Sequence, residues 1–348
     1  AWMRAAGAPR SGARGWACRA AGRRPEINRI ERSRWADGVP ERMGGHLMPS
    51  GEVAPISTSK GAGEGVFVHP FQYHGEPSEW QVLVHPSKDA LYAGLADKVK
   101  ACYEEAVARK GSFTIALSGG SLVAALGAVA AMEGIEWGKW HVFWADERVV
   151  PLDHEDSNFK GAQQAFLGLT SIPESQVYTL DPALPTAQAA LVYEARMRGL
   201  GEDVLPRSAS QPGMPKLDLV LLGIGPDGHV ASLFPNKPQT AAQEGWVLGV
   251  TDSPKPPPER ITLSMPAINA AAQVCVVAAG GSKAEVIQRL LEVQALPGSL
   301  PAQLVRPSDG VLSIFLDQDA AARLQPETWE QPKKFPRSQV PKPEVKKK

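Results

Sequence analysis

The segment 217–235 constrains the fold of this chain more than any other stretch. It opens with the apolar run LDLVLL and breaks at two glycines, and such a run bounded by turn residues is typical of a central strand in a parallel sheet. Asp227 and His229 follow the glycines, and the small residues Ala231–Ser232 predict the start of a helix. Ligands of open α/β sheets bind just beyond the carboxyl ends of such strands. A carboxylate and an imidazole at this point are therefore placed for chemistry.

A structural role for this pair is the main alternative. An isolated Asp-x-His sequence more often holds an aspartate that caps a helix and a histidine that simply packs in the core. The glycines around Asp227 and His229, together with the motifs below, favour the chemical interpretation.

Strand and helix patterns alternate through the middle of the chain. This alternation predicts an α/β fold: a doubly wound, mostly parallel, Rossmann-like sheet with helices on both faces, in a single catalytic domain over 66–325. Ser87 is the expected N-cap of the first helix. The predicted strands cover 81–85, 113–117, 141–145, 217–222, 261–264, 274–278 and 311–316, and the predicted helices cover 87–109, 121–132, 158–167, 188–198, 282–291 and 318–324.

The two ends of the chain differ from the middle in composition. Residues 1–65 are rich in Arg, Ala and Gly, and the first 25 hold six arginines and no acid, which is typical of an organelle transit peptide. We therefore expect a largely disordered extension that targets the protein to the chloroplast stroma. A plain extension or translated upstream sequence, with Met43 or Met48 as the true start and a cytosolic protein, is the alternative. Residues 326–348 are expected to form a solvated, basic Pro/Lys-rich tail.

Charge and cysteine content exclude several classes of function. The net charge is zero, but residues 66–325 carry 19 basic and 28 acidic residues, and so acidic a domain is not expected to bind nucleic acid. No apolar run reaches the ~18 residues of a membrane span. Cys18, Cys102 and Cys275 show no paired spacing, so neither a disulfide framework nor a metal site is expected. We expect a monomer or weak homo-oligomer that acts on a small molecule.

A glycine-rich turn follows the predicted strand over 113–117. Ser118, Gly119, Gly120 and Ser121 form this turn and open a helix. Backbone N–H groups at the start of a helix suit a phosphate, and the two hydroxyls add donors. The turn lacks the lysine of a Walker loop and the spacing of a dinucleotide fingerprint, so it does not indicate a nucleotide. It predicts an anion site, with a simple turn as an equal alternative.

A charged segment follows the predicted strand over 141–145. Asp146 and Glu147 are placed to serve as a base and its orienting partner, and Arg148 can bind an oxyanion through two parallel hydrogen bonds. Asn158 is a further expected substrate contact, although a helix cap explains it equally well. The structural alternative for the whole segment is an acidic surface loop with a local ion pair.

Two basic residues occupy further element ends. Arg260 follows a stiff triple-proline run at the start of a predicted strand. Lys283 lies in the first turn of a helix, where its charge opposes the helix dipole. That position is easier to understand if Lys283 meets an anion, although a freely solvated lysine is a fair alternative. If these groups converge, they build a pocket for a small phosphorylated, oxygen-rich molecule.

Taken together, these motifs resemble the 6-phosphogluconolactonase family, within the wider glucosamine-6-phosphate isomerase and lactonase superfamily. They occur in the family's order through the middle domain, and the resemblance does not extend to the two ends of the chain. The matching stretches are LSGGS at 117–121, WADERVVP at 144–151 with DSN at 156–158, LLGIGPDGHVASLFP at 221–235, PPERITL at 257–263 and GGSKAEV at 280–286.

The resemblance implies hydrolysis of 6-phospho-D-glucono-1,5-lactone to 6-phospho-D-gluconate, the second step of the oxidative pentose phosphate pathway, without a required cofactor. It makes His229 the base that activates water and Asp227 its orienting or charge-tuning partner. It assigns Arg148, Lys283 and the SGGS turn to the phosphate or the developing oxyanion. A lactone carbonyl needs an activated water and an oxyanion donor, and an imidazole is a suitable base near neutral pH.

Two alternative functions are also compatible with these motifs. In glucosamine-6-phosphate deaminases the Asp-Gly-His run is followed by an Asn-Glu-Pro element that supplies a second carboxylate, whereas residues 232–235 of this chain read SLFP and contain no acid. The other alternative is a non-catalytic sugar-phosphate sensor fused to a DNA-binding module. Residues 1–65 show no helix-turn-helix pattern, which disfavours the sensor.

Overall fold

The structure is a computed structural model that describes residues 66–73, 76–293 and 295–325. The expectations for 1–65 and 326–348 lie outside these described residues. Within the described ranges, no helix is long and apolar enough to cross a membrane.

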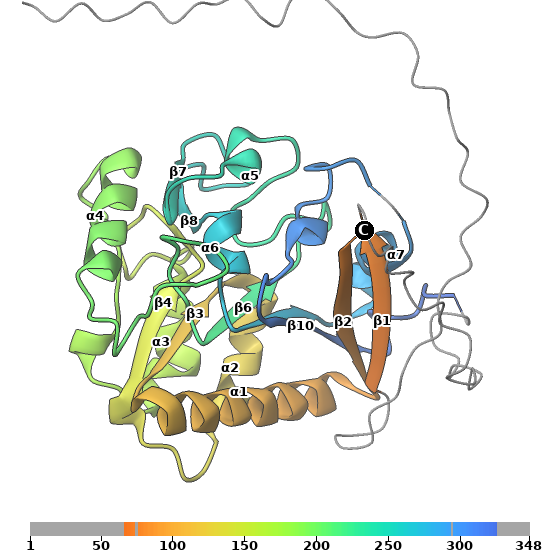
Figure 1. The fold of residues 1–348 in the computed structure, drawn as a ribbon, viewed down its shortest axis with the longest axis horizontal. Helices are drawn as coiled ribbons and strands as arrows, with labels where there is room; N and C mark the ends of the chain where they lie inside the picture. Colours follow the sequence, from red (N-terminus) through yellow and green to blue (C-terminus); the bar gives the residue numbers. More distant parts are fainter. Residues whose placement is uncertain (1–65, 74–75, 294, 326–348) are drawn as a thin grey trace, which may run out of the picture. The chain divides into compact units, whose positions relative to one another are not determined.

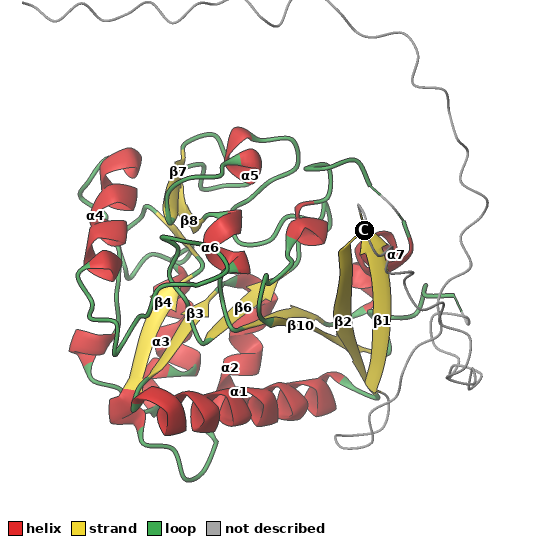
Figure 2. Cartoon of the chain, viewed as in Figure 1, coloured by secondary structure: helices red, strands yellow, loops and turns green. Residues whose placement is uncertain are grey.

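A central sheet of seven strands organises the described residues, in the order β1-β2-β10-β9-β6-β3-β4 (Figures 1 and 2). All neighbouring strands run parallel except β1, which pairs antiparallel with β2 at one edge. The predicted α/β, mostly parallel sheet is therefore confirmed. Its strands are β1 (Val66–Tyr73), β2 (Glu76–His85), β3 (Phe113–Leu117), β4 (Trp140–Trp144), β6 (Leu219–Gly223), β9 (Gln273–Ala278) and β10 (Val311–Asp317).

The chain changes direction at β3. It steps from β3 to β4 on one side, then returns to β6 on the other side and continues to β9 and β10. Figure 1 shows α1 and α6 on opposite sides of the sheet, as expected when right-handed crossovers reverse direction, whereas α3 packs against α2. The helices are α1 (Lys88–Lys110), α2 (Val123–Ala130), α3 (Asn158–Ala165), α4 (Thr186–Arg198), α5 (Pro238–Ala241), α6 (Met265–Asn269) and α7 (Ala284–Glu292).

The core strands are apolar because helices cover both of their faces. Every residue of β3 is buried, and Leu219–Leu222 of β6 are fully buried beside it. An aromatic cluster closes the opposite end of β3 from the glycine turn, where Phe113 packs edge-on against Trp140 with ring centroids 4.7 Å apart. Burial of each such side chain contributes roughly 2–3 kcal/mol, which makes these strands a rigid base for the loops that follow them.

A second, smaller sheet lies beyond the end of β4. It consists of β5 (Asp146–Arg148), β8 (Arg260–Leu263) and β7 (Val247–Val250), paired antiparallel in the order β5-β8-β7. The strand predicted over 261–264 therefore exists, but it belongs to this small sheet rather than to the parallel one. Its pairing with β5 ties the segment after the triple-proline run to the charged segment after β4.

Most predicted elements agree with the structure to within a few residues. Ser87 caps α1, since its hydroxyl accepts a hydrogen bond from the Ala90 N–H at 3.2 Å. The elements not expected from the sequence are the edge strand β1, the strands β5 and β7 of the small sheet, and the short helices α5 and α6.

Two predicted helices are wrong. No helix begins at Ala231–Ser232: Ala231 has a left-handed backbone with φ of 49°, and the N–H of Ser232 donates to the Thr262 hydroxyl at 3.2 Å. Val230 pairs through isolated bridges with Ile224 and Leu233, so the segment after His229 forms tight turns in place of a helix. The segment 318–324 forms consecutive turns, in which the N–H of Ala320 donates to the Asp317 carboxylate at 2.8 Å.

Candidate active site

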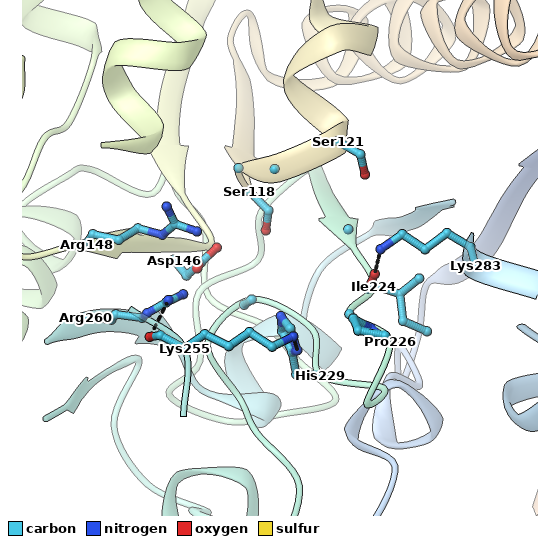
Figure 3. A pocket seen from close by; sticks show the side chains of 15 residues that line it. Ser118, Ser121, Asp146, Arg148, Ile224, Pro226, His229, Lys255, Arg260 and Lys283 are labelled. Atoms are coloured by element: carbon cyan, nitrogen blue, oxygen red, sulfur yellow. Dashed lines mark hydrogen bonds between the residues drawn. The ribbon is translucent and has the colours of Figure 1, made fainter. Parts of the chain in front are cut away.

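A cavity of about 220 Å³ opens at the carboxyl ends of β3, β6 and β9, beside the point where the chain reverses direction (Figure 3). This is where doubly wound sheets bind their ligands. Most of the residues expected from the sequence meet here, although they come from strand ends far apart in the chain. The cavity is lined by Ser118, Gly119, Gly120, Ser121, Asp146, Arg148, Gly223, Ile224, Gly225, Pro226, His229, Ala231, Lys255, Arg260 and Lys283.

The glycine turn after β3 forms one wall. Gly119 has no room for a side chain, because a Cβ atom there would overlap the Asn158 amide. Gly120 has φ of 69°, a conformation that glycine adopts without strain, and it opens the single 3-10 turn η1 (Gly120–Leu122) that leads into α2. The buried hydroxyl of Ser118 has no hydrogen-bond partner among the described residues, and it points into the cavity in Figure 3. The wall thus presents a free hydroxyl and the N–H groups of a helix start.

The loop after β6 places an imidazole beside a carboxylate. His229 Nδ1 lies 2.5 Å from Asp227 Oδ1. The ring also packs against Gly225, where a Cβ atom would overlap it, and it lies 4.7 Å from the Phe234 ring between centroids. Since a carboxylate only accepts hydrogen bonds, Nδ1 carries the proton and Nε2 is left with a lone pair. Nε2 has no hydrogen-bond partner in the part of the chain that the structure describes.

The electrostatics of the pair favour a neutral imidazole and an ionised carboxylate. Burial lowers the pKa of His229 below its usual 6.5, and the opposing effect of Asp227 does not fully reverse this. Burial alone would raise the pKa of Asp227, but the hydrogen bond from His229 and the positive charge of Lys255 lower it overall. Near neutral pH, His229 is therefore neutral with Nε2 unprotonated, and Asp227 is ionised.

Lys255 is a site residue that the sequence analysis missed. Its ammonium nitrogen lies 3.3 Å from Asp227 Oδ1 and 3.3 Å from His229 Nδ1. The only signal in the sequence was its position directly before the triple-proline run, within the same segment as Arg260. Nothing in that local pattern indicates that the loop folds back over the strand end of β6.

Two arginines share another wall. Arg148 of β5 and Arg260 of β8 are directly opposite in the antiparallel ladder. Three carbonyl groups of the preceding loop hold the Arg260 guanidinium at 2.9–3.0 Å. Arg148 donates to the Asp156 carbonyl at 2.6 Å, and its buried Nε has no hydrogen-bond partner among the described residues. Burial and the charge of Arg148 both lower the pKa of Arg260.

Lys283 and Asp146 complete the charged lining. Lys283 ends the 3-10 turn η5 (Gly281–Lys283) after β9, and its ammonium donates to the Ile224 carbonyl at 2.7 Å. Burial and the nearby charge of Lys255 lower the pKa of Lys283. Asp146 is buried and accepts a hydrogen bond from the Ser232 hydroxyl at 2.8 Å. In Figure 3 the arginines and Lys283 lie on opposite sides of the cavity.

Glu147 and Asn158, both expected to contact substrate, lie behind the wall instead. The buried Glu147 carboxylate accepts hydrogen bonds from the N–H groups of Arg148, Asn158 and Phe159 at 2.7–2.8 Å, so it fastens the start of α3 to β5. Burial raises its pKa, and these donors partly offset that effect. The Asn158 amide donates to the Asp146 carbonyl at 2.7 Å. The alternative of a local structural role is therefore the better account of both residues.

The described residues contain no group of three or more His, Cys, Asp or Glu side chains arranged to hold a metal ion. The cavity instead gathers four cationic side chains around one buried carboxylate, Asp146, with the His229–Asp227 pair at its edge. Cations and helix-start N–H groups bind an anionic ligand, and a neutral imidazole next to them can take a proton from a bound water. This fold and site define the class: an α/β protein with a cationic cavity, suited to a small anionic ligand, at the carboxyl edge of its parallel sheet.

Comparisons with known proteins define the class more narrowly. Residues 86–314 match the family described as glucosamine-6-phosphate isomerases/6-phosphogluconolactonase. The chain is 43% identical over 247 residues to a probable chloroplastic 6-phosphogluconolactonase 3 of Oryza sativa subsp. indica, a match that covers 70% of this chain and 76% of the relative. It is 40% identical over 250 residues to a probable 6-phosphogluconolactonase 1 of Arabidopsis thaliana, covering 70% and 93% of the two chains.

A solved structure shows the same relationship. The 6-phosphogluconolactonase of Trypanosoma brucei superimposes with a TM-score of 0.59 at 29% sequence identity, over 70% of this chain and 98% of that one. The chain therefore belongs to the glucosamine-6-phosphate isomerase/6-phosphogluconolactonase family.

Proposed function

We propose that this protein hydrolyses 6-phospho-D-glucono-1,5-lactone to 6-phospho-D-gluconate, with His229 as the base. Nε2 of His229 takes a proton from water while the water oxygen attacks the lactone carbonyl. The tetrahedral oxyanion then collapses, the bond between the carbonyl carbon and the ring oxygen breaks, and the imidazolium returns its proton to the departing ring oxygen. The observation that carries this proposal is the 2.5 Å contact between Asp227 Oδ1 and His229 Nδ1, which leaves Nε2 unprotonated at the cavity.

The cationic lining supports a substrate with two anionic centres in the transition state. The substrate carries a phosphate, and the attacked carbonyl becomes an oxyanion. Arg148 and Arg260 on one side of the cavity and Lys283 on the other are placed to divide these two charges, with the Ser118 hydroxyl as an additional donor. No covalent nucleophile is needed, because the lactone opens readily with an activated water.

The features beside His229 support lactone hydrolysis over deamination. A deaminase would need a second carboxylate in the segment after His229, where this chain has Phe234 instead. The Phe234 ring contacts the imidazole and lies 5.7 Å from the Arg260 guanidinium. An apolar ring at this place contributes shape and a dry environment but no acid chemistry.

The test is a direct comparison of two reactions. Acid release from freshly prepared 6-phosphogluconolactone is measured above the spontaneous rate, beside ammonia release from glucosamine 6-phosphate. We expect lactone hydrolysis only, and a loss of at least about 10²-fold in kcat for His229→Ala, since a positioned base contributes about 10²–10⁴-fold. Full activity in His229→Ala would refute the assigned base. Binding of sugar phosphates without either reaction would establish the sensor alternative.

We also propose that residues 1–65 include a plastid transit peptide and that the mature protein works in the stroma. The support is the arginine-rich, acid-free start of the sequence and the chloroplastic relatives from Oryza sativa. Sequencing the amino terminus of the mature native protein tests this, because a transit peptide predicts a start near the beginning of the described domain.

A monomer or weak homo-oligomer remains our expectation for the assembly, and sedimentation of the purified protein measures its oligomeric state.

A further inference from the structure

The ammonium group of Lys255 contacts both members of the Asp227–His229 pair but has no part in the reaction described above. We infer that Lys255 is a positioning residue, which holds the Asp227 carboxylate against the imidazole and keeps His229 unprotonated before substrate binds. The inference rests on the proposed function, in which His229 must be unprotonated to accept a proton from water.

The geometry of the contact explains how Lys255 can both orient the Asp227 carboxylate and disfavour protonation of His229. An ammonium group and a protonated Nδ1 are both donors, so neither can accept from the other. Asp227 Oδ1 is therefore the shared acceptor, at 2.5 Å from His229 Nδ1 and 3.3 Å from Lys255 Nζ. Two donors on one oxygen restrict the rotation of the carboxylate. The same arrangement sets a positive charge 3.3 Å from the ring nitrogen that would share the charge of an imidazolium.

Several charged groups act on the imidazole from the surrounding elements. Asp227 on its own loop and Asp146 on β5 both favour the protonated ring, whereas Lys255 and burial oppose it. Lys283 on η5 lies close enough to respond to both Lys255 and Asp227. Lys255 is thus the cation that balances two carboxylates. Without it, the carboxylates would act on His229 with only burial to oppose them.

The side chain of Lys255 can be changed without releasing its loop. The backbone of Lys255 is held independently, since its carbonyl accepts from the Arg260 guanidinium at 2.9 Å and from the Ser253 hydroxyl at 2.8 Å. The Lys255 N–H donates to the same hydroxyl at 3.2 Å. The side chain itself is 37% exposed. A methionine of similar length therefore removes the charge and leaves the wall of the cavity in place.

The experiment is the pH profile of kcat/KM for the full chain and for Lys255→Met, Lys255→Arg and Lys237→Met. One charge about 4 Å away in a watery environment changes a protonation equilibrium by about 1 kcal/mol, or about fivefold. We expect Lys255→Met to lower the ratio of kcat/KM at pH 6 to that at pH 8 by roughly three- to fivefold. Lys255→Arg should restore most of this ratio. Lys237 pairs with Asp252 outside the cavity lining, so Lys237→Met should leave the profile unchanged.

A second measurement separates this inference from the proposed function. The titration of His229 is followed by NMR in the substrate-free protein, with His229→Gln to assign its signals. Lys255→Met should shift the titration to higher pH whether or not the protein hydrolyses the lactone. An unshifted titration overturns the inference. A uniform fall in kcat/KM with an unmoved profile also overturns it, because that result places Lys255 on the substrate instead. Lack of lactone hydrolysis by the wild type would refute only the proposed function.

Discussion

Arg148 and Arg260 face each other as directly opposed residues of the antiparallel strands β5 and β8. Like charges in this relationship repel and destabilise a ladder. Arg260 is held by the carbonyls of Lys255, Pro256 and Pro257, but the buried Nε of Arg148 has no hydrogen-bond partner within the described ranges. An anion between the two guanidinium groups would remove the repulsion and satisfy the free donor. We therefore expect the pair to couple the stability of the domain to binding of an anionic ligand.

The first prediction follows from this coupling. Saturation with 6-phosphogluconate should raise the Tm of the protein by about 3–8 °C, because ligand at about 100 times Kd adds ~2.7 kcal/mol to the free energy of unfolding. Arg148→Gln removes one of the opposed charges, so its Tm without ligand should equal or exceed that of the wild type, while the ligand-induced rise should shrink to less than half. Differential scanning fluorimetry measures both.

Arg196→Gln provides the matched control. Arg196 lies on α4, where its guanidinium donates to the Thr179 carbonyl at 2.8 Å, outside the cavity lining. This variant should keep the full ligand-induced rise. A normal rise in Arg148→Gln would show that the anion binds elsewhere.

The sequence was sufficient to predict the parallel strands and the residues at their ends. β3, β6 and β9 are buried on both faces, so each appears in the sequence as a short apolar run with a glycine at its end or within two residues after it. The end of each run marks the edge of the sheet where ligands bind. His229, the SGGS turn and Lys283 could be placed at one cavity on that basis alone, because topology fixes where the ends of parallel strands meet.

The remaining features depend on contacts between distant segments. Glu147 and Asn158 lie close to Asp146 in the fold, but Glu147 accepts from the Asn158 N–H and the Asn158 amide donates to the Asp146 carbonyl, so both side chains are bonded within the protein. Lys255 enters the site only because its loop is anchored to Arg260, 5 residues further on. Ala231 leaves the helical region because the next residue, Ser232, bonds to β8 and to Asp146. The local pattern of apolar and polar residues does not reveal hydrogen-bond partners of this kind.

The second prediction concerns Asp227. Asp227→Asn replaces the acceptor of the Nδ1 proton with a group that can also donate, so the imidazole loses the preference that keeps Nε2 unprotonated. We expect kcat to fall by about 10²–10⁴-fold while KM changes less than threefold, as for the loss of a general base. Steady-state kinetics at pH 8 measures this, with near-ultraviolet circular dichroism to verify the fold. A kcat within threefold of the wild type would show that Asp227 does not orient the base.

The third prediction concerns pH and His141 on β4. Its Nδ1 lies 2.9 Å from the Tyr178 hydroxyl and its Nε2 lies 3.0 Å from the Gln176 amide nitrogen, so the neutral ring donates on one side and accepts on the other. Burial, reinforced by the charge of Lys110, lowers the pKa of His141 from its usual 6.5 to about 4. The unfolded chain therefore binds this proton more strongly than the folded protein does. The stability that the neutral His141 ring contributes is fully present above about pH 6.5 and is lost as the pH falls through about 4.

Urea unfolding at two pH values measures the effect. After allowance for the partial exposure of the ring, the His141 contribution should lower the free energy of unfolding by about 1 kcal/mol between pH 7 and pH 5. His85 and His229 also have lowered pKa values and act in the same direction. His141→Gln should therefore reduce the pH dependence by this amount without abolishing it. An equal dependence in the variant would show that His141 protonates as readily in the folded protein as in the unfolded chain.

The fourth prediction concerns Asp317, which holds the turn that carries Lys283. Both oxygens of its buried carboxylate accept from the Gly280 N–H at 2.9 Å, and Gly280 has φ of 87° where η5 begins. Asp317→Asn keeps one acceptor and removes the charge, which should cost about 1–3 kcal/mol of stability. Because the turn positions Lys283 rather than the base, KM for the lactone should rise several-fold while kcat stays within about twofold.

Asp309→Asn separates the local effect of removing the Asp317 carboxylate from the general effect of removing one negative charge. Asp309 pairs with Lys216 at 2.9 Å near the protein surface, so its loss should change stability by less than about 0.5 kcal/mol and leave KM unaltered. Chemical denaturation measures the free energy of unfolding of both variants, and steady-state kinetics measures their KM and kcat. If Asp317→Asn lowers kcat as strongly as it raises KM, then the turn after β9 contributes to the chemical step as well as to binding, and Lys283 contacts the oxyanion rather than the phosphate alone.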